Sequence, residues 1–167
     1  MVKKFILVGT LLITPLVLGA CMAGIVPAGP ERAEALLDST AGNSVSGKVS
    51  MTQTSKRLRV VAEVSGLPPG AHAIRIHEKG DCSAPDASSA GDYFRPPGVP
   101  DRSDDLPQLV ANRKGLAKLV VYIDRAALLE SEMNIIGRSV VVHGFTAEPR
   151  NPQASGTRLA CGVIVKK

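Results

Sequence analysis

Histidine is the residue of this chain best suited to bind a transition metal or to exchange a proton near neutral pH. The chain has three, His72, His77 and His143. Arg75 lies two residues before His77, so in a β-strand both side chains point to the same face. A guanidinium is always charged and has only hydrogen-bond donors, so Arg75 opposes the binding of a metal cation at that face.

The sequence from Ser44 onward has the pattern of the β-strands that would position these side chains. Apolar residues come in short runs bounded by Gly, Pro and Asn, which is typical of an all-β protein. Ile74 and Ile76 alternate with Arg75 and His77, so we expect the isoleucines to face the core. The predicted strands are residues 44–51, 58–65, 72–77, 116–123, 139–145 and 158–165, with one or two weaker strands between them or at the edges.

Two long connections separate the predicted strands. Residues 80–107 are rich in proline, and residues 144–156 contain Pro149 and Pro152. Loops of this length in a compact domain are usually functional or disordered, and a cross-link would argue against disorder. Residues 124–133 favour a short helical turn.

The first twenty residues have the pattern of an export signal. Lys3 and Lys4 precede an apolar run over residues 5–18, which is short for a membrane span. The run ends in Leu-Gly-Ala-Cys, typical of a bacterial lipoprotein cleavage site. We predict that residues 1–20 are a lipoprotein signal peptide and that Cys21 becomes the lipidated first residue. The alternative is an ordinary signal peptide in which Cys21 has no such role.

The remaining chain divides into a tether and one domain. Residues 21–43 are rich in small residues, so we predict a tether that holds the domain away from the membrane. Pro30 and the residues after it favour a short helical turn within the tether. Residues 44–167 then form the domain, whose core must consist of Val, Ile, Leu and Ala because the chain has no Trp.

The charge of the chain excludes little. It carries 20 Lys and Arg against 15 Asp and Glu, a mildly basic balance. We see no basic stripe interleaved with aromatic residues, so a nucleic acid is not expected as a partner.

The three cysteines predict one disulfide bond. With Cys21 lipidated, Cys82 and Cys161 remain, and an even pair in an exported domain indicates a disulfide. It would connect the first long loop to the last strand. The alternative is two unpaired thiols.

Four stretches of the chain resemble the copper,zinc superoxide dismutase family. They are residues 70–82 (GAHAIRIHEKGDC), 105–110 (DLPQLV), 137–143 (GRSVVVH) and 156–164 (GTRLACGVI). The resemblance covers nearly all of residues 44–167. It implies an eight-stranded antiparallel Greek-key barrel, and it aligns Cys82 and Cys161 with the disulfide of the family.

The resemblance implies a copper site with two of its four histidines present. The His-x-His strand of the family reads Arg75-Ile76-His77, so Arg75 replaces the first ligand and His77 matches the second. Tyr93 stands where the family has the histidine that bridges copper and zinc. His143 matches the last copper ligand. Copper therefore remains an open alternative, with His77 and His143 as ligands and Tyr93 or Asp92 as weak further donors.

The zinc site that the resemblance implies retains fewer of its ligands than the copper site does. Residues 91–105 contain no histidine, and only Asp105 matches one of the four zinc ligands of the family. A structural zinc ion needs four ligands in a tetrahedral array. We therefore do not expect zinc to bind here.

Three further residues acquire expected roles from the resemblance. His72 matches a histidine that braces loops through hydrogen bonds and is not a ligand. Arg158 matches the arginine that guides superoxide to copper, or else it braces the last loop. For Arg75 we hypothesise a pairing with Asp92, Asp105 or a tyrosine oxygen, in a pocket without metal.

These features predict a superoxide dismutase-like lipoprotein of the bacterial envelope with a degraded metal site and little or no dismutase activity. Its partners would be the membrane, through the lipid anchor, and superoxide if the site is active. Met22 after Cys21 favours the outer membrane, with the domain facing the periplasm. The alternatives are a copper-dependent dismutase with a reduced ligand set, or a Cu(I) carrier that uses His77 and His143 as a linear pair.

Overall fold

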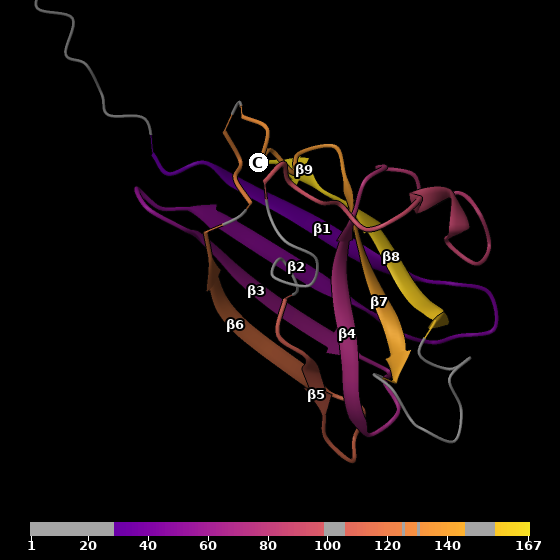
Figure 1. Cartoon of the computed structure of the whole chain (residues 1–167). Helices are drawn as coiled ribbons and strands as arrows, with labels where there is room; N and C mark the ends of the chain where they lie inside the picture. Colours follow the sequence, from indigo (N-terminus) through magenta and orange to yellow (C-terminus); the bar gives the residue numbers. More distant parts are fainter. Residues whose placement is uncertain (1–28, 99–105, 125, 130, 146–155) are drawn as a thin grey trace, which may run out of the picture.

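The computed structural model describes residues 29–98, 106–124, 126–129, 131–145 and 156–167 (Figure 1). This part of the chain is almost entirely β-structure. Its strands are β1 (Arg32–Ser39), β2 (Ser46–Gln53), β3 (Leu58–Ser65), β4 (Gly70–His77), β5 (Leu109–Ala111), β6 (Ala117–Ile123), β7 (Ser139–Phe145), β8 (Arg158–Val163) and β9 (Val165–Lys166). One short 3-10 helix, η1 (Ser88–Ala90), lies in the loop after β4. No helix in the described ranges is long and apolar enough to cross a membrane.

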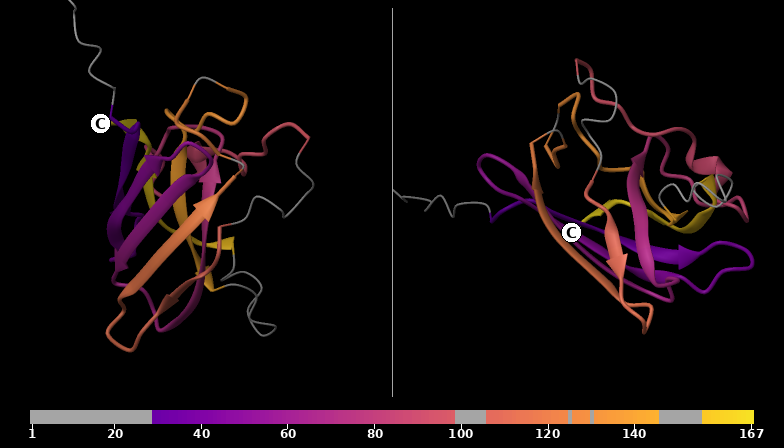
Figure 2. Two further views of the ribbon diagram at one scale, coloured as in Figure 1. Left: turned by 90° about the vertical axis from the view of Figure 1, so that its left-hand side faces the viewer. Right: turned by 60° about the horizontal axis from the view of Figure 1, so that its bottom comes forward.

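The strands form one antiparallel sheet that curls into a nearly closed barrel (Figures 1 and 2). The strand order is β5-β4-β7-β8-β1-β2-β3-β6, with the short β9 paired to β1. The two strands at the ends of this order, β5 and β6, follow each other in the chain and are joined by a tight turn at residues 112–115. The prediction of an eight-stranded antiparallel barrel is therefore confirmed.

Most strands lie where the alternation of apolar residues places them. β3 and β7 have the predicted bounds, and β2, β4 and β6 differ from the prediction only at their ends. The predicted last strand is interrupted at Ile164, which separates β8 from β9. Residues 126–129 and 131–134 form turns and a bridge between Ala127 and Asn134, so the helical turn predicted there is wrong for the described residues.

The start of the domain also requires a correction. Residues 32–39, which we assigned to the tether, form β1, a strand in the middle of the sheet between β2 and β8. Ala33, Ala35 and Leu37 alternate with exposed or half-buried residues and are buried in the core. Burial of every second residue is typical of a strand. Packing of this face against the core outweighs the helical propensity of alanine, glutamate and leucine. The domain therefore begins near Arg32, and the helical turn predicted after Pro30 is wrong.

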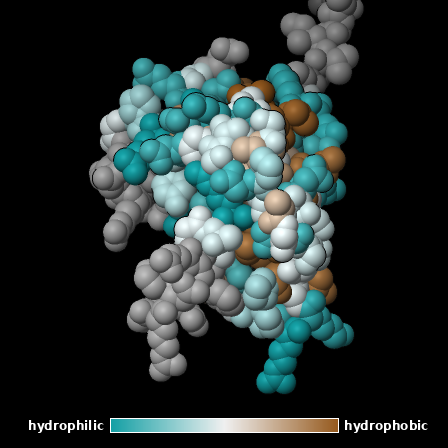
Figure 3. All heavy atoms as spheres, turned by 90° about the vertical axis from the view of Figure 1, so that its right-hand side faces the viewer, coloured by the Kyte–Doolittle hydropathy of each residue, from teal (hydrophilic) through white to brown (hydrophobic). Residues whose placement is uncertain are grey.

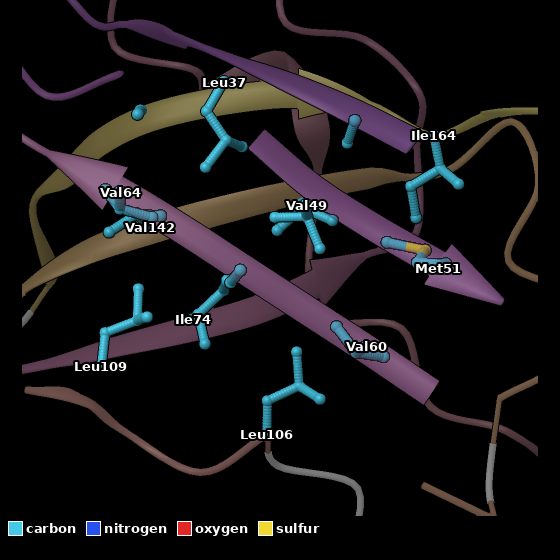
Figure 4. Packing of buried hydrophobic residues seen from close by; sticks show 14 of the residues in the cluster. Leu37, Val49, Met51, Val60, Val64, Ile74, Leu106, Leu109, Val142 and Ile164 are labelled. Atoms are coloured by element: carbon cyan, nitrogen blue, oxygen red, sulfur yellow. The ribbon is translucent and has the colours of Figure 1, made fainter. Parts of the chain in front are cut away.

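The core is built from small and branched aliphatic side chains, as the absence of Trp requires. Figure 4 shows the inner faces of several strands contributing to one cluster. Val49, Ile74 and Val142 are fully buried at its centre. Each such side chain contributes about 1.5–3 kcal/mol to stability relative to an exposed one. The cluster fixes β4 and β7 side by side, and these two strands carry the histidines.

A disulfide bond joins Cys82, in the loop after β4, to Cys161 of β8. Their Cα atoms are 5.8 Å apart, and the bond confirms the predicted pairing. It holds the loop that carries η1 against the barrel. On the side of the molecule shown in Figure 3, hydrophilic and neutral residues predominate, with hydrophobic ones in small groups.

Close packing of β8 against β1 predicts a strong effect of a single added methyl group. A Cβ at Gly162 would lie 2.1 Å from the carbonyl oxygen of Leu36, a backbone atom with little freedom to move. We expect Gly162→Ala to lower the free energy of unfolding by about 1–3 kcal/mol, measured by urea denaturation. Gly156→Ala is the control, because nothing lies within 4 Å of its added Cβ. Equal stability of the two variants would contradict this account of the β1–β8 contact.

Candidate metal site

The structure brings His77 and His143 into direct contact. His77 is the last residue of β4, and His143 lies on the neighbouring strand β7. Their Nε2 atoms are 3.1 Å apart, and the rings are nearly parallel with centroids 5.3 Å apart. Both side chains are buried, with 0% and 2% of their surface exposed. Two residues far apart in the sequence thus form one pair, which we call the histidine pair.

Hydrogen bonding defines which ring nitrogens carry protons. The Nδ1 atom of His77 lies 3.0 Å from the carbonyl oxygen of Gly91, which can only accept, so Nδ1 carries the proton. The Nε2 atom of His77 is then an acceptor, and His143 donates to it from its own Nε2. This leaves Nδ1 of His143 as an unprotonated nitrogen, buried and without a hydrogen-bond partner. Each ring is thus a neutral imidazole with one protonated nitrogen, and the Nε2 atoms act as donor on His143 and as acceptor on His77.

The surroundings of the histidine pair favour the neutral form of both rings. Burial is the largest cause of a lowered pKa at His143, followed by charge repulsion from His77, Arg158 and Arg75, and together they lower it from 6.5 to about 3. Burial also lowers the pKa of His77, although the hydrogen bond to Gly91 opposes this shift. Both rings are therefore uncharged at neutral pH.

Two arginines flank the histidine pair and are held by backbone carbonyls. Arg158 donates to the carbonyl oxygens of Ala87 at 2.5 Å and Gly91 at 2.8 Å. Arg75 donates to the carbonyl oxygens of Ile74 and Leu106, each at 3.3 Å. The hypothesised pairing of Arg75 with Asp92, Asp105 or a tyrosine oxygen stays a prediction, and Asp105 lies outside the described residues. Arg158 accordingly braces the loop after β4, whatever further role it has.

Tyr93 approaches the histidine pair from that loop. It forms an isolated β-bridge with His77, so the loop runs antiparallel to the end of β4. The Tyr93 ring is edge-on to both imidazoles, with centroids 5.0 Å from His77 and 5.7 Å from His143. It remains 40% exposed. The neighbouring Asp92 is also exposed, and its backbone oxygen accepts a hydrogen bond from the amide of Glu78.

His72 has the structural position that the resemblance implied. It is fully buried, and its Nε2 lies 2.7 Å from the carbonyl oxygen of Pro68. Its Nδ1 lies 3.2 Å from the carbonyl oxygen of His143. His72 thus ties the turn before β4 to β7 and supports the backbone at His143.

The carbonyl oxygen of Gly91 is a functional group that sequence reasoning missed. It accepts hydrogen bonds from both His77 and Arg158, so it links the histidine pair to the loop after β4. Gly91 has a φ of 75°, which favours glycine, and a Cβ there would lie 2.7 Å from Oε1 of Glu78. The sequence shows only that a glycine precedes Asp92. It does not show the direction in which the carbonyl group of Gly91 points.

Fold and site together define a class of protein. It is an antiparallel barrel that carries a buried histidine pair on two neighbouring strands. A disulfide holds the loop beside this pair to β8.

Comparison with known proteins specifies the family. The family model for copper/zinc superoxide dismutase matches residues 45–164. The chain is 34% identical to a Cu-Zn superoxide dismutase of Caulobacter vibrioides, covering 71% of this chain and 77% of that protein. It is 34% identical to that of Escherichia coli K12, covering 74% and 80%, and 35% identical to an extracellular one of Drosophila melanogaster, covering 72% and 75%. The chain belongs to the copper/zinc superoxide dismutase family.

The donors in the described residues do not fit the metal pair of that family. Cu(II) favours about four nitrogen or oxygen ligands in a tetragonal array. The described part of the chain contains no group of three His, Cys, Asp or Glu residues that could hold a metal ion. The two Nε2 atoms of the histidine pair are bonded to each other, and Arg75 occupies the strand position of a further ligand. These residues therefore do not form the copper and zinc sites of the family.

The spacing of the histidine pair also bears on copper coordination. Metal–nitrogen bonds of about 2.0 Å place two nitrogens about 2.8 Å apart at a right angle and about 4 Å apart in a line. The observed 3.1 Å is close to the first geometry. A linear Cu(I) site would therefore require the two rings to separate.

The neutral histidine pair predicts a specific loss of stability in acid. Because the pKa of His143 in the folded chain lies well below 6.5, the unfolded chain binds more protons as the pH falls from about 6.5 toward 3. We expect His143 to contribute a slope of up to about 1.4 kcal/mol per pH unit in this window. Urea denaturation at several pH values measures it, and His143→Gln should show a shallower slope. Parallel slopes for the two chains would exclude a buried neutral His143.

Proposed function

We propose that this protein is a superoxide dismutase-like lipoprotein of the bacterial envelope whose metal site has been lost, with little or no dismutase activity. One observation carries the proposal. The two histidines that remain from the copper site bind each other through their Nε2 atoms, the atoms that would face a shared metal. The two Nε2 atoms are thus paired with each other without a metal ion.

The charges around the pair support the same conclusion. Arg75 stands at the strand position where the family has a histidine ligand, and it brings a permanent positive charge close enough to lower the pKa of His143. A bound copper ion would experience the same repulsion. Tyr93, at the position of the bridging ligand, is half-exposed and offers a single phenol oxygen as a donor.

The proposed location rests on the export signal and on the disulfide. Cys21 lies outside the described residues, and its lipidation belongs to the proposal. A disulfide between Cys82 and Cys161 suits an oxidising compartment such as the periplasm. The relative from Drosophila melanogaster is named an extracellular enzyme, so export occurs among similar proteins. We place the anchor in the outer membrane because Met22, and not an aspartate, follows Cys21.

Superoxide dismutation after metal loading tests the proposal. The chain and its Escherichia coli relative are loaded in parallel with copper and zinc, and their rates are compared by pulse radiolysis. We expect the chain to reach less than about 1% of the rate of the relative, because steering alone does not replace a redox metal. A rate that approaches that of the relative and disappears in His143→Ala would establish the enzyme with a reduced ligand set instead.

Copper binding without turnover is the second candidate. The observation that favours it is the 3.1 Å spacing of the two Nε2 atoms, close to that of two neighbouring ligands of one metal ion. Copper would have to displace the proton between the rings and tolerate Arg75. The loading experiment identifies this case as stoichiometric copper with no acceleration of dismutation. If copper binds only under reducing conditions, the protein is the Cu(I) carrier.

A further inference from the structure

One end of the outer sheet face gathers basic side chains. Strand register places Arg32 of β1 beside Thr52 of β2. Arg59 of β3 lies between Thr52 and Tyr122 of β6. The alternate residues of these strands belong to the core cluster, so this row points outward. The row carries two guanidinium groups, a half-exposed tyrosine and no carboxylate.

The same end collects further cations from the β2–β3 hairpin and from the last residues of the chain. We call this group the basic end, and it consists of Arg32, Lys56, Arg57, Arg59, Lys166 and Lys167. Among the described residues, three side-chain carboxylates at this end each pair with one of these cations, as Arg57–Asp124, Lys166–Glu31 and Lys167–Glu34. The pairs leave Arg32, Lys56 and Arg59 as an excess of three positive charges.

The next charged row of the sheet carries a smaller excess, of one positive charge. In the row that contains Lys48, Glu63 and Lys118, the carboxylate of Glu63 lies 2.7 Å from Nζ of Lys118. Between this row and the basic end lie the apolar Val61 and Val120, of which Val120 is 49% exposed. The basic end thus combines positive charge with Tyr122 and Val120, a combination suited to the headgroup region of a membrane.

The polypeptide preceding the domain enters at the same end. The described chain begins at Gly29 and passes directly into β1 at Arg32, whose side chain is in the basic end (Figures 1 and 2). Cys21 precedes Arg32 by so few residues that even a fully extended chain spans at most about 40 Å. An acyl chain on Cys21 would therefore confine the basic end close to the membrane surface. This confinement raises the effective concentration of the basic end at the headgroups.

We propose that the basic end docks on anionic phospholipid headgroups and fixes the orientation of the anchored barrel. The inference rests on the lipid anchor of the proposed function. Lys and Arg side chains near an anionic leaflet are attracted individually, and the attraction falls off within a Debye length. The short connection to Cys21 strengthens docking, and docking depends on salt and on anionic lipid.

The two tyrosines of the chain provide the test. Tyr122 lies in the basic end, and Tyr93 lies beside His77, so the second serves as an internal control. The full-length lipidated protein is placed in vesicles of phosphatidylcholine with or without about 30% phosphatidylglycerol, and iodination by a water-soluble reagent is measured for each tyrosine. We expect the labelling of Tyr122 to fall at least about threefold with phosphatidylglycerol and to recover in high salt. Labelling of Tyr93 should not change.

Matched variants assign the effect to the basic end. Lys56→Gln with Arg59→Gln should abolish the protection of Tyr122. Arg113→Gln with Lys114→Gln removes the same charge from the turn at the other end of β6 and should leave the protection intact. Equal labelling of Tyr122 on both kinds of vesicle, or equal protection of both tyrosines, would overturn the proposal.

The anchor itself is assessed separately. The mass of the N-terminal peptide reports whether Cys21 carries acyl chains, and a peptide without them contradicts the proposed function. The unanchored chain is then sedimented with the same vesicles. Sedimentation with phosphatidylglycerol vesicles that is lost in Lys56→Gln with Arg59→Gln supports the docking surface, and its absence from both kinds of vesicle contradicts it.

Discussion

Replacing Cys82 and Cys161 by serine lowers the free energy of unfolding of this protein by up to about 4–5 kcal/mol. The two cysteines are separated by 79 residues, so the bond restricts more than half of the domain in the unfolded chain. The chain-entropy treatment of such a loop gives the quoted magnitude as an upper figure. Urea denaturation under oxidising conditions measures the difference.

Loss of the bond also changes the histidine pair. The disulfide holds the loop that supplies the carbonyl oxygens of Ala87 and Gly91, and these bind Arg158 and His77. The wild-type chain in reductant is the control and should unfold at the same urea concentration as the double variant. A difference of less than about 1 kcal/mol between the oxidised wild type and the variant would show that the barrel core alone determines stability.

Substituting Arg75 by histidine raises the affinity of the chain for Cu(II) by about 100-fold or more, equivalent to about 2.7 kcal/mol. The change adds an imidazole on the same face of β4 as His77, and it removes a permanent positive charge that lies close to His143. Both effects favour a bound cation. Competition titration against a chelator of known affinity measures the change.

Arg59→His is the matched control for this experiment. It makes the same substitution on β3, whose Arg59 lies beside Tyr122 and away from the histidine pair. The control should leave copper affinity unchanged. If Arg75→His raises the affinity only as much as Arg59→His does, Arg75 is not what keeps copper out of the site.

The fold was predictable where hydrophobic alternation is regular. In β3, apolar Leu58, Val60, Ala62 and Val64 repeat with a period of two and are all buried, and the predicted bounds were correct. β1 was missed because its inward residues are mainly alanines and its outward ones include Leu36, so the contrast between the faces is weak. Only pairing with β2 and β8, which depends on the whole chain, establishes it as a strand.

The candidate site was predictable in its residues but not in its bonds. Resemblance to the family selected His77 and His143, and the barrel brings them together. The hydrogen bond between their rings depends on the direction of the Gly91 carbonyl, which fixes the proton on His77. Backbone geometry of this kind follows from the packing of the loop, and no residue type in the sequence encodes it.

We propose that the two rings of the histidine pair hydrogen-bond to each other in place of binding a metal ion. The metal content of the protein purified from its own cells, in buffers free of chelators, tests it most directly. We expect less than about one-tenth of an equivalent of copper or zinc per chain, because the Nε2 atoms of His77 and His143 pair with each other and Arg75 repels a cation. A content close to one copper per chain would contradict the account and would show that Arg75 and the histidine pair rearrange around a bound ion.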